Sequence, residues 1–94
     1  MSVVTEKRRV RIRNRLGLHA RAAARFVQTA NRFRARISVS RDGRVMDGKS
    51  ILGMLLLAAS AGTVLELSAE GEDAPAALDA LTALVEGGLG EEVS

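Results

Sequence analysis

His19 is the only histidine of the chain, and it stands where a glycine-bearing loop, Asn14 to Leu18, gives way to an alanine-rich segment typical of a helix. A neutral imidazole can act as a nucleophile. The first backbone N–H groups of a helix have no partner within it, and the helix dipole adds positive partial charge at that end. A phosphoryl group on His19 would therefore meet the N–H groups of Ala20 and Arg21, together with the Arg21 guanidinium. The segment predicts a site that accepts and holds phosphate.

The spacing of these residues leaves a second interpretation open. A lone histidine beside a helix start is more often a surface or capping residue than a catalytic one, and short motifs are weak evidence by themselves. Arg25 follows Arg21 by one helical turn, so the two cations share a helix face and could assist at one anion.

Ser50 precedes a second helical segment, residues 51–57. Serine is among the preferred N-cap residues, and this structural role is a sufficient explanation. Phosphate at a helix N-terminus is electrostatically tolerated, so a phosphorylated Ser50 would act by repelling or blocking a partner rather than by unfolding the helix.

The segment after Ser50, Ile51 to Leu57, is too apolar on all sides for a helix with one face in water. Something else must cover part of it. An exposed group of large apolar residues beside a charged site suits a transient protein interface, whereas for any single residue core packing is an equal alternative.

Composition limits the class of protein. A chain of 94 residues with 47% hydrophobic residues makes one small domain, residues 1–94. No apolar stretch approaches the roughly 20 residues of a membrane span, and the basic N-terminus lacks the apolar segment of a signal peptide. The lack of cysteine and the single histidine argue against a disulfide framework and a metal site. We expect no cofactor, no membrane insertion and a cytoplasmic location.

Charge is distributed unevenly along the chain. All 14 Lys and Arg residues fall between Lys7 and Lys49, whereas residues 51–94 hold eight acidic residues and no basic ones. A basic block of this kind could bind nucleic acid. The only aromatic residues, Phe26 and Phe33, lie at helical core spacing, so no platform for stacking bases is evident. We expect no nucleic-acid partner, and charge that steers the domain toward acidic proteins.

Hydrophobic periodicity and turn residues predict seven elements. We expect strands over 4–13, 36–40, 44–47 and 63–69, and helices over 20–33, 51–57 and from Asp73, as N-cap, to Gly87. Arginines are expected to fill the solvent face of the first strand, and residues 89–94 to form a frayed tail. The pattern predicts an α+β fold, an open-faced sandwich in which an antiparallel sheet is covered on one face by helices.

Two motifs at this separation resemble those of the HPr family of bacterial phosphocarrier proteins. They are Asn14-x-x-Gly17-Leu18-His19-Ala20-Arg21 and, about thirty residues later, Gly48-Lys49-Ser50-Ile51-Leu52-Gly53-Met54. The likeness extends to Gly62-Thr63 at the entry to the last strand, to Ser68-Ala69-Glu70-Gly71, which closes that strand, and to the final helix, which ends near Gly87-Gly88. It implies four antiparallel strands and three helices.

The resemblance also implies a function. His19 would accept a phosphoryl group from phosphorylated enzyme I of the phosphotransferase system and pass it to a histidine of an enzyme IIA component, with Arg21 as a catalytic partner and Ala20 and Arg21 as phosphate-binding residues. Such a protein is a monomeric carrier in sugar transport rather than a free-standing enzyme. Ser50 would be a regulatory phosphorylation site in hosts with an HPr kinase.

The resemblance further assigns Ile51, Leu52 and Leu55 to the docking patch near His19, with Met54, Leu56 and Leu57 less certain. One residue departs from the family pattern: Ala22 stands where proline usually follows the arginine. Alanine preserves the helix, so the chemistry should survive with altered phosphate geometry. The departure keeps an alternative function open, an HPr-like regulatory module that acts through Ser50 and the docking patch without phosphate transfer.

Overall fold

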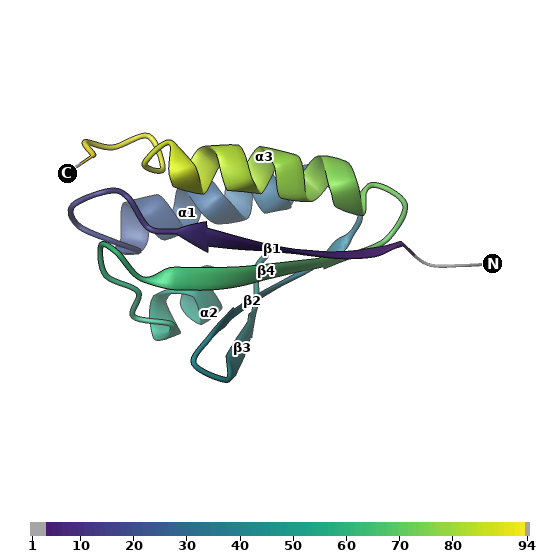
Figure 1. Ribbon diagram of the computed structural model, residues 1–94, viewed down its shortest axis with the longest axis horizontal. Helices are drawn as coiled ribbons and strands as arrows, with labels where there is room; N and C mark the ends of the chain where they lie inside the picture. Colours follow the sequence, from purple (N-terminus) through teal and green to yellow (C-terminus); the bar gives the residue numbers. More distant parts are fainter. Residues whose placement is uncertain (1–3, 94) are drawn as a thin grey trace.

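The chain forms four strands and three helices in the computed structural model, which describes residues 4–93 (Figure 1). The elements are β1 Thr5–Arg11, α1 Ala20–Ala30, β2 Arg36–Arg41, β3 Arg44–Asp47, α2 Ile51–Leu56, β4 Val64–Glu70 and α3 Ala74–Glu86. The strands form one antiparallel sheet in the order β1-β4-β2-β3. Helices α1 and α3 pack against each other along the sheet, and α2 contacts α1 and β3. The predicted α+β class, with a four-stranded antiparallel sheet and three helices, is confirmed.

Alternation along the strands separates the core from the solvent face, as the period of two requires. In β4, Leu65, Leu67 and Ala69 are buried while the residues between them are partly exposed. Register places buried partners opposite them: Val10 faces Leu65 across β1–β4, and Val39 faces Leu67 across β2–β4. The core of the sheet therefore lies under α1 and α3.

The solvent face of β1 carries the expected arginines, Arg9 and Arg11, together with Lys7, and all three are exposed. Arg8 shares the inner face with Val10, where its guanidinium donates to the Asp79 carboxylate of α3 at 2.8 Å. Leu67, the β4 residue opposite Arg8, is fully buried, whereas the Asp79 side chain is 71% exposed, so Arg8 lies at the edge of the core. Strand β1 is also shorter than the expected 4–13, although Ile12 beyond its end is buried.

The first helix ends at Ala30, three residues before the expected end. The chain must turn before β2, and the Asp73 carboxylate stabilises this turn by accepting from the backbone N–H groups of Arg34 and Ala35, both at 2.8 Å. Asp73 stands at the N-cap of α3 as expected, but its side chain makes no capping bond to its own helix. Phe26 is fully buried, whereas Phe33, beyond the helix end, is only half-buried against the core.

The expected frayed tail is wrong for residues 89–93. Leu89 is fully buried, the Arg25 side chain donates to its carbonyl at 2.8 Å, and Val93 forms a backbone bridge with Asn14. Gly88, Leu89 and Gly90 all have positive φ, which turns the chain back after α3 onto the start of α1. Glycine at two of these three positions makes the turn accessible. Ser94 lies outside the described residues.

Candidate functional site

The loop before α1 is held by a buried asparagine. The Asn14 side chain is fully buried, and its amide donates to the Gly17 carbonyl at 2.7 Å. Gly17 has φ +67, and a Cβ built there would lie 2.4 Å from the carbonyl oxygen of Ala59. The backbone therefore requires glycine at this position both for its conformation and for its close approach to the segment before β4.

His19 is the N-cap of α1. Its backbone is extended, its carbonyl accepts from the N–H of Ala23 at 2.8 Å, and its Nδ1 accepts from the N–H of Arg21 at 3.3 Å. An imidazole nitrogen that accepts a hydrogen bond carries the lone pair. The structure thus assigns the lone pair to Nδ1 and points it at the helix N-terminus, where a bound anion would be stabilised.

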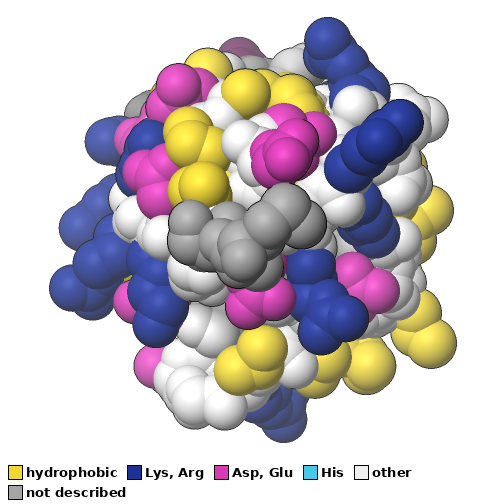
Figure 2. Space-filling model, turned by 90° about the vertical axis from the view of Figure 1, so that its right-hand side faces the viewer, with side chains coloured by type: hydrophobic (Ala, Val, Ile, Leu, Met, Phe, Trp, Pro, Cys, Tyr) yellow, Lys and Arg dark blue, Asp and Glu magenta, His cyan; other side chains and the backbone are white. Residues whose placement is uncertain are grey.

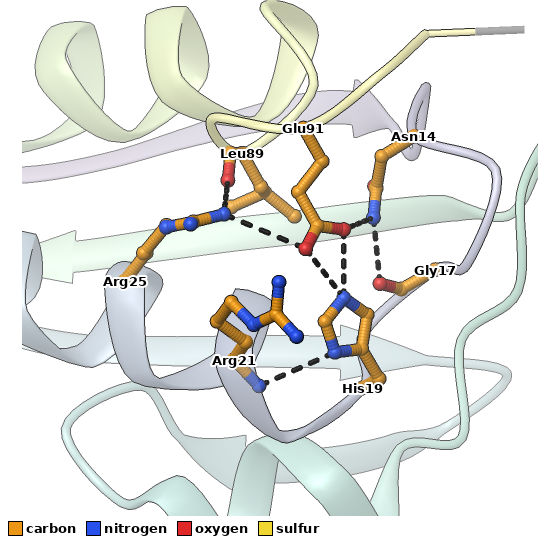
Figure 3. Close-up of polar contacts among 7 residues, drawn as sticks. All are labelled: Asn14, Gly17, His19, Arg21, Arg25, Leu89 and Glu91. Carbon is orange, nitrogen blue, oxygen red and sulfur yellow. Dashed lines mark hydrogen bonds and ion pairs between the residues drawn. The ribbon is translucent and has the colours of Figure 1, made fainter.

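The other ring nitrogen faces a residue that sequence reasoning missed. Both carboxylate oxygens of Glu91, in the tail after α3, lie 2.7 Å from His19 Nε2 (Figure 3). The same carboxylate accepts from the Asn14 amide at 3.0 Å and lies 3.5 Å from the Arg25 guanidinium. The hydrogen bond from His19 is the main cause that lowers the pKa of Glu91, and Asn14 and Arg25 act in the same direction. The sequence signal that could have indicated an ordered tail is Leu89, a large apolar residue between Gly88 and Gly90.

Of the predicted phosphate-binding groups, the Arg21 N–H already has a partner in His19 Nδ1. Among residues 4–93, the Ala20 N–H has no hydrogen-bond partner. The Arg21 side chain is exposed and lies beside His19 in Figure 3. Arg25 instead binds the tail, through Leu89 and Glu91.

A surface pocket of about 430 Å³ is lined in part by Arg21 and Glu91, which both contact His19. Its lining comes from both ends of the chain: Arg15, Leu16, Arg21, Arg25, Gly90, Glu91 and Glu92. Three arginines and two carboxylates thus meet beside the proposed phosphate acceptor.

Helix α2 divides its apolar residues between core and solvent. Met54 and, just after the helix, Leu57 are buried, whereas Ile51 and Leu52 are 44% and 67% exposed. Leu55, expected in the docking patch, is half-buried against the core. The exposed positions also include Leu56, at 52%.

Two further features bear on this surface. Leu16, in the loop before α1, is 74% exposed and was not among the predicted docking residues. Ser50 caps α2, since its hydroxyl accepts from the N–H of Gly53 at 2.9 Å.

The basic and acidic halves of the sequence meet in the fold. Besides Arg8 with Asp79, ion pairs join Arg13 to Glu86 and Arg15 to Glu92 across β1, the following loop and the C-terminal region. On the end of the molecule opposite His19, Figure 2 shows Lys and Arg side chains interspersed with Asp and Glu. Within the part of the chain that the structure describes, no helix is long and apolar enough to cross a membrane.

Comparison with known proteins agrees with the resemblance. The family model described as the PTS HPr component phosphorylation site matches residues 6–87. The chain is 46% identical to the phosphocarrier protein HPr of Neisseria meningitidis over 85 residues, which cover 90% of this chain and 96% of that protein. The HPr structure from Thermoanaerobacter tengcongensis has a TM-score of 0.85 and 46% identity, and the match covers 99% of this chain and 100% of that one.

A third relative is a variant of the same fold. It is the HPr-like protein Crh of Bacillus subtilis, a catabolite repression protein whose crystal structure is an intertwined dimer with a swapped domain. That structure has a TM-score of 0.73 and 46% identity, and the match covers 84% of this chain and 91% of Crh. The family model and these relatives, taken with the histidine at the start of α1, establish that the chain belongs to the HPr phosphocarrier family.

Proposed function

We propose that the protein is a phosphocarrier that accepts a phosphoryl group on Nδ1 of His19 from phosphorylated enzyme I and passes it to a histidine of an enzyme IIA component. The observation that carries this proposal is the position of Nδ1, whose lone pair faces the N-terminus of α1 through the Arg21 N–H. Phosphoryl transfer depends on positioning and on charge stabilisation, and the place of Nδ1 at a helix N-terminus supports a role in both.

Each transfer is an in-line displacement at phosphorus. The Nδ1 lone pair forms the new P–N bond while the bond to the donor histidine breaks and its electron pair returns to the donor ring. Once Nδ1 carries the phosphoryl group it can no longer accept a hydrogen bond. The Arg21 N–H then donates to a phosphate oxygen instead, beside the Ala20 N–H, and the Arg21 guanidinium adds a charge-assisted bond. The protein contributes the acceptor and its surroundings, and the partner proteins contribute the other reacting histidines, so it acts as a carrier rather than as an independent enzyme.

Docking is assigned to Ile51, Leu52 and Leu55, of which Leu52 is the most exposed. The arginines around His19 would speed encounter with acidic partner surfaces. We infer that the carrier works as a monomer in the cytoplasm, without nucleic acid, metal or cofactor. Sedimentation at working concentration tests the monomer against the dimeric arrangement that Crh adopts.

The test of the carrier function is intact-mass analysis after incubation with phosphoenolpyruvate, magnesium and enzyme I. Wild type should gain one acid-labile phosphoryl adduct, and His19→Ala should gain none. An HPr of known competence, charged in the same tube, controls for the donor. No adduct on wild type beside a charged control would refute the proposal.

A second candidate function is a regulatory protein-binding module that acts through Ser50 and the same patch without phosphate transfer. The likeness to Crh, a catabolite repression protein, supports it. The Ser50 hydroxyl is part-buried in its bond to Gly53, so modification must open that cap. Incubation with an HPr kinase should phosphorylate wild type and leave Ser50→Ala unmodified, and equal labelling of both would exclude Ser50 as the site.

A further inference from the structure

We propose that Glu91 is a positioning residue for the transfer. Its carboxylate holds the proton on His19 Nε2 both when Nδ1 is unmodified and when Nδ1 carries the phosphoryl group. This inference rests on the proposed function of His19. It assigns a role in the reaction to the C-terminal tail, which is not part of either motif.

The contacts of the imidazole give each ring nitrogen one role. Nε2 lies 2.7 Å from both oxygens of Glu91, a distance typical of a charge-assisted hydrogen bond. An ionised carboxylate can only accept, so Nε2 must donate. Nδ1 accepts from the Arg21 N–H on the other side of the ring. The phosphoryl group can therefore bond to Nδ1 while the Nε2–H···Glu91 bond stays intact.

The carboxylate is held in place by contacts that do not involve His19. Its own side chain is only 12% exposed and accepts from the Asn14 amide at 3.0 Å. On either side of it, the Leu89 carbonyl accepts from Arg25 at 2.8 Å and the Glu92 carbonyl accepts from the Arg15 N–H at 3.3 Å. Glu91 is thus preorganised for the histidine, which lowers the cost of ordering it during the reaction.

This arrangement matters for the leaving group. When Nδ1 of the Nε2–H tautomer attacks phosphorus, the ring keeps its Nε2 proton and takes a formal positive charge. On transfer to the acceptor the P–N bond breaks, the electron pair returns to Nδ1, and a neutral imidazole leaves. If Nε2 had lost its proton, the leaving group would be an imidazolate, which is a far stronger base. A carboxylate at Nε2 stabilises the protonated phosphoimidazole and so keeps the phosphoryl group transferable.

The other charges around this pair come from three elements. Helix α1 contributes Arg21 and Arg25, the loop before it contributes Arg15, and the tail contributes Glu92. The pKa of the Glu91 carboxyl lies below its usual range, because His19 and Asn14 donate to it and Arg25 is near. The carboxylate is therefore charged wherever the carrier would work.

The experiment compares Glu91→Gln with Glu92→Gln. Both remove one negative charge from adjacent tail positions, but Glu92 is exposed and pairs with Arg15 rather than with His19. Each variant is charged by enzyme I with labelled phosphoenolpyruvate, separated from the donor, and discharged to an enzyme IIA domain from pH 6 to pH 9. Thermal unfolding and the amide resonances of Leu89 and Val93 report whether the tail remains folded.

In Glu91→Gln we expect the alkaline limb of the discharge profile to move to lower pH by about one unit, because an opposite charge at this range shifts a titration by about 1–3 units. Discharge on that limb should be roughly tenfold slower than in wild type, and Glu92→Gln should follow wild type. A loosened tail would instead slow discharge at every pH and shift the tail resonances. Glu91→Asp, which restores the charge, should recover the alkaline limb of the wild-type profile.

Three outcomes would overturn the inference, and they are distinguishable. If wild type is charged and Glu91→Gln discharges with the wild-type profile, Glu91 has no role in holding the proton although the carrier function stands. If Glu91→Gln accepts or discharges faster than wild type, the tail obstructs the site. Failure of wild type to be charged would refute the carrier function itself, and this inference with it.

Discussion

Replacement of Gly17 by alanine tests how the loop before α1 presents His19. Two separate costs arise at this position. The backbone has φ +67, where an L-residue with a Cβ is disfavoured by roughly 1–2 kcal/mol. The new Cβ would also lie 2.4 Å from the Ala59 carbonyl oxygen, closer than any van der Waals contact permits. That oxygen cannot move away freely, because it accepts from the N–H of Leu18 at 2.9 Å.

A matched control separates the two costs. Gly43, in the β2–β3 turn, has φ +83, and a Cβ there would meet nothing within 4 Å. Alanine restricts the unfolded chain more than glycine does, which returns about 0.4–1 kcal/mol at both sites. We therefore expect Gly43→Ala to lower the free energy of unfolding by about 1 kcal/mol. Gly17→Ala adds an overpacking cost of about 1–3 kcal/mol, for a total of about 2–4 kcal/mol.

Urea unfolding at pH 7 gives the free energy of unfolding of both variants and of wild type. In thermal melts, the Tm should fall by about 4–8 °C for each kcal/mol of stability lost in a domain of this size. Charging by enzyme I gives a second readout, because displacement of Ala59 moves the loop that carries His19. Gly17→Ala should be charged more slowly than Gly43→Ala at a temperature where both are folded. Equal losses of stability, within about 0.5 kcal/mol, would refute the claim that the contact with Ala59 requires glycine.

The remaining predictions concern the core, the docking patch and acid stability. Leu81→Ala empties a fully buried site of α3 and should cost about 2–5 kcal/mol in urea unfolding. Leu52→Ser, at an exposed position of α2, should change stability by less than about 0.5 kcal/mol yet raise the KM for charging by enzyme I about fivefold or more, whereas an unchanged KM removes Leu52 from the docking patch. The backbone N–H of Arg34, with that of Ala35, lowers the pKa of Asp73. A depressed carboxyl pKa stabilises the fold above the unfolded value near 4, and this contribution is lost as the pH falls through the folded value. The stability difference between wild type and Asp73→Asn should therefore narrow between about pH 4 and pH 2, and a constant difference would contradict it.

Much of the fold followed from local patterns because local physics determines them. Alternation predicted the buried face of β4, since successive side chains of a strand point to opposite sides. Ser50 and Pro75 mark helix starts through capping and fixed φ, which act within one turn. Asp42 and Gly43 indicated the β2–β3 hairpin, where both residues indeed have positive φ.

The errors share one cause, which is contact between segments far apart in the chain. The tail after α3 is ordered because Leu89 is buried and Arg25, 64 residues earlier, donates to its carbonyl. Asp73 leaves its own helix uncapped because the turn before β2 offers two N–H groups. Several arginines of the basic block form ion pairs with acidic residues of the C-terminal half, and no local sequence pattern could show this pairing.

The site divides in the same way. The sequence by itself determined the acceptor histidine at a helix start, the glycine loop before it and the serine cap of α2, because each depends on residues within a few positions of one another. Only the tertiary structure decided which nitrogen of His19 carries the proton and what holds that proton. That decision comes from Glu91, 72 residues away, which reaches Nε2 because the buried Leu89 and the side chain of Arg25 fix the tail against α1.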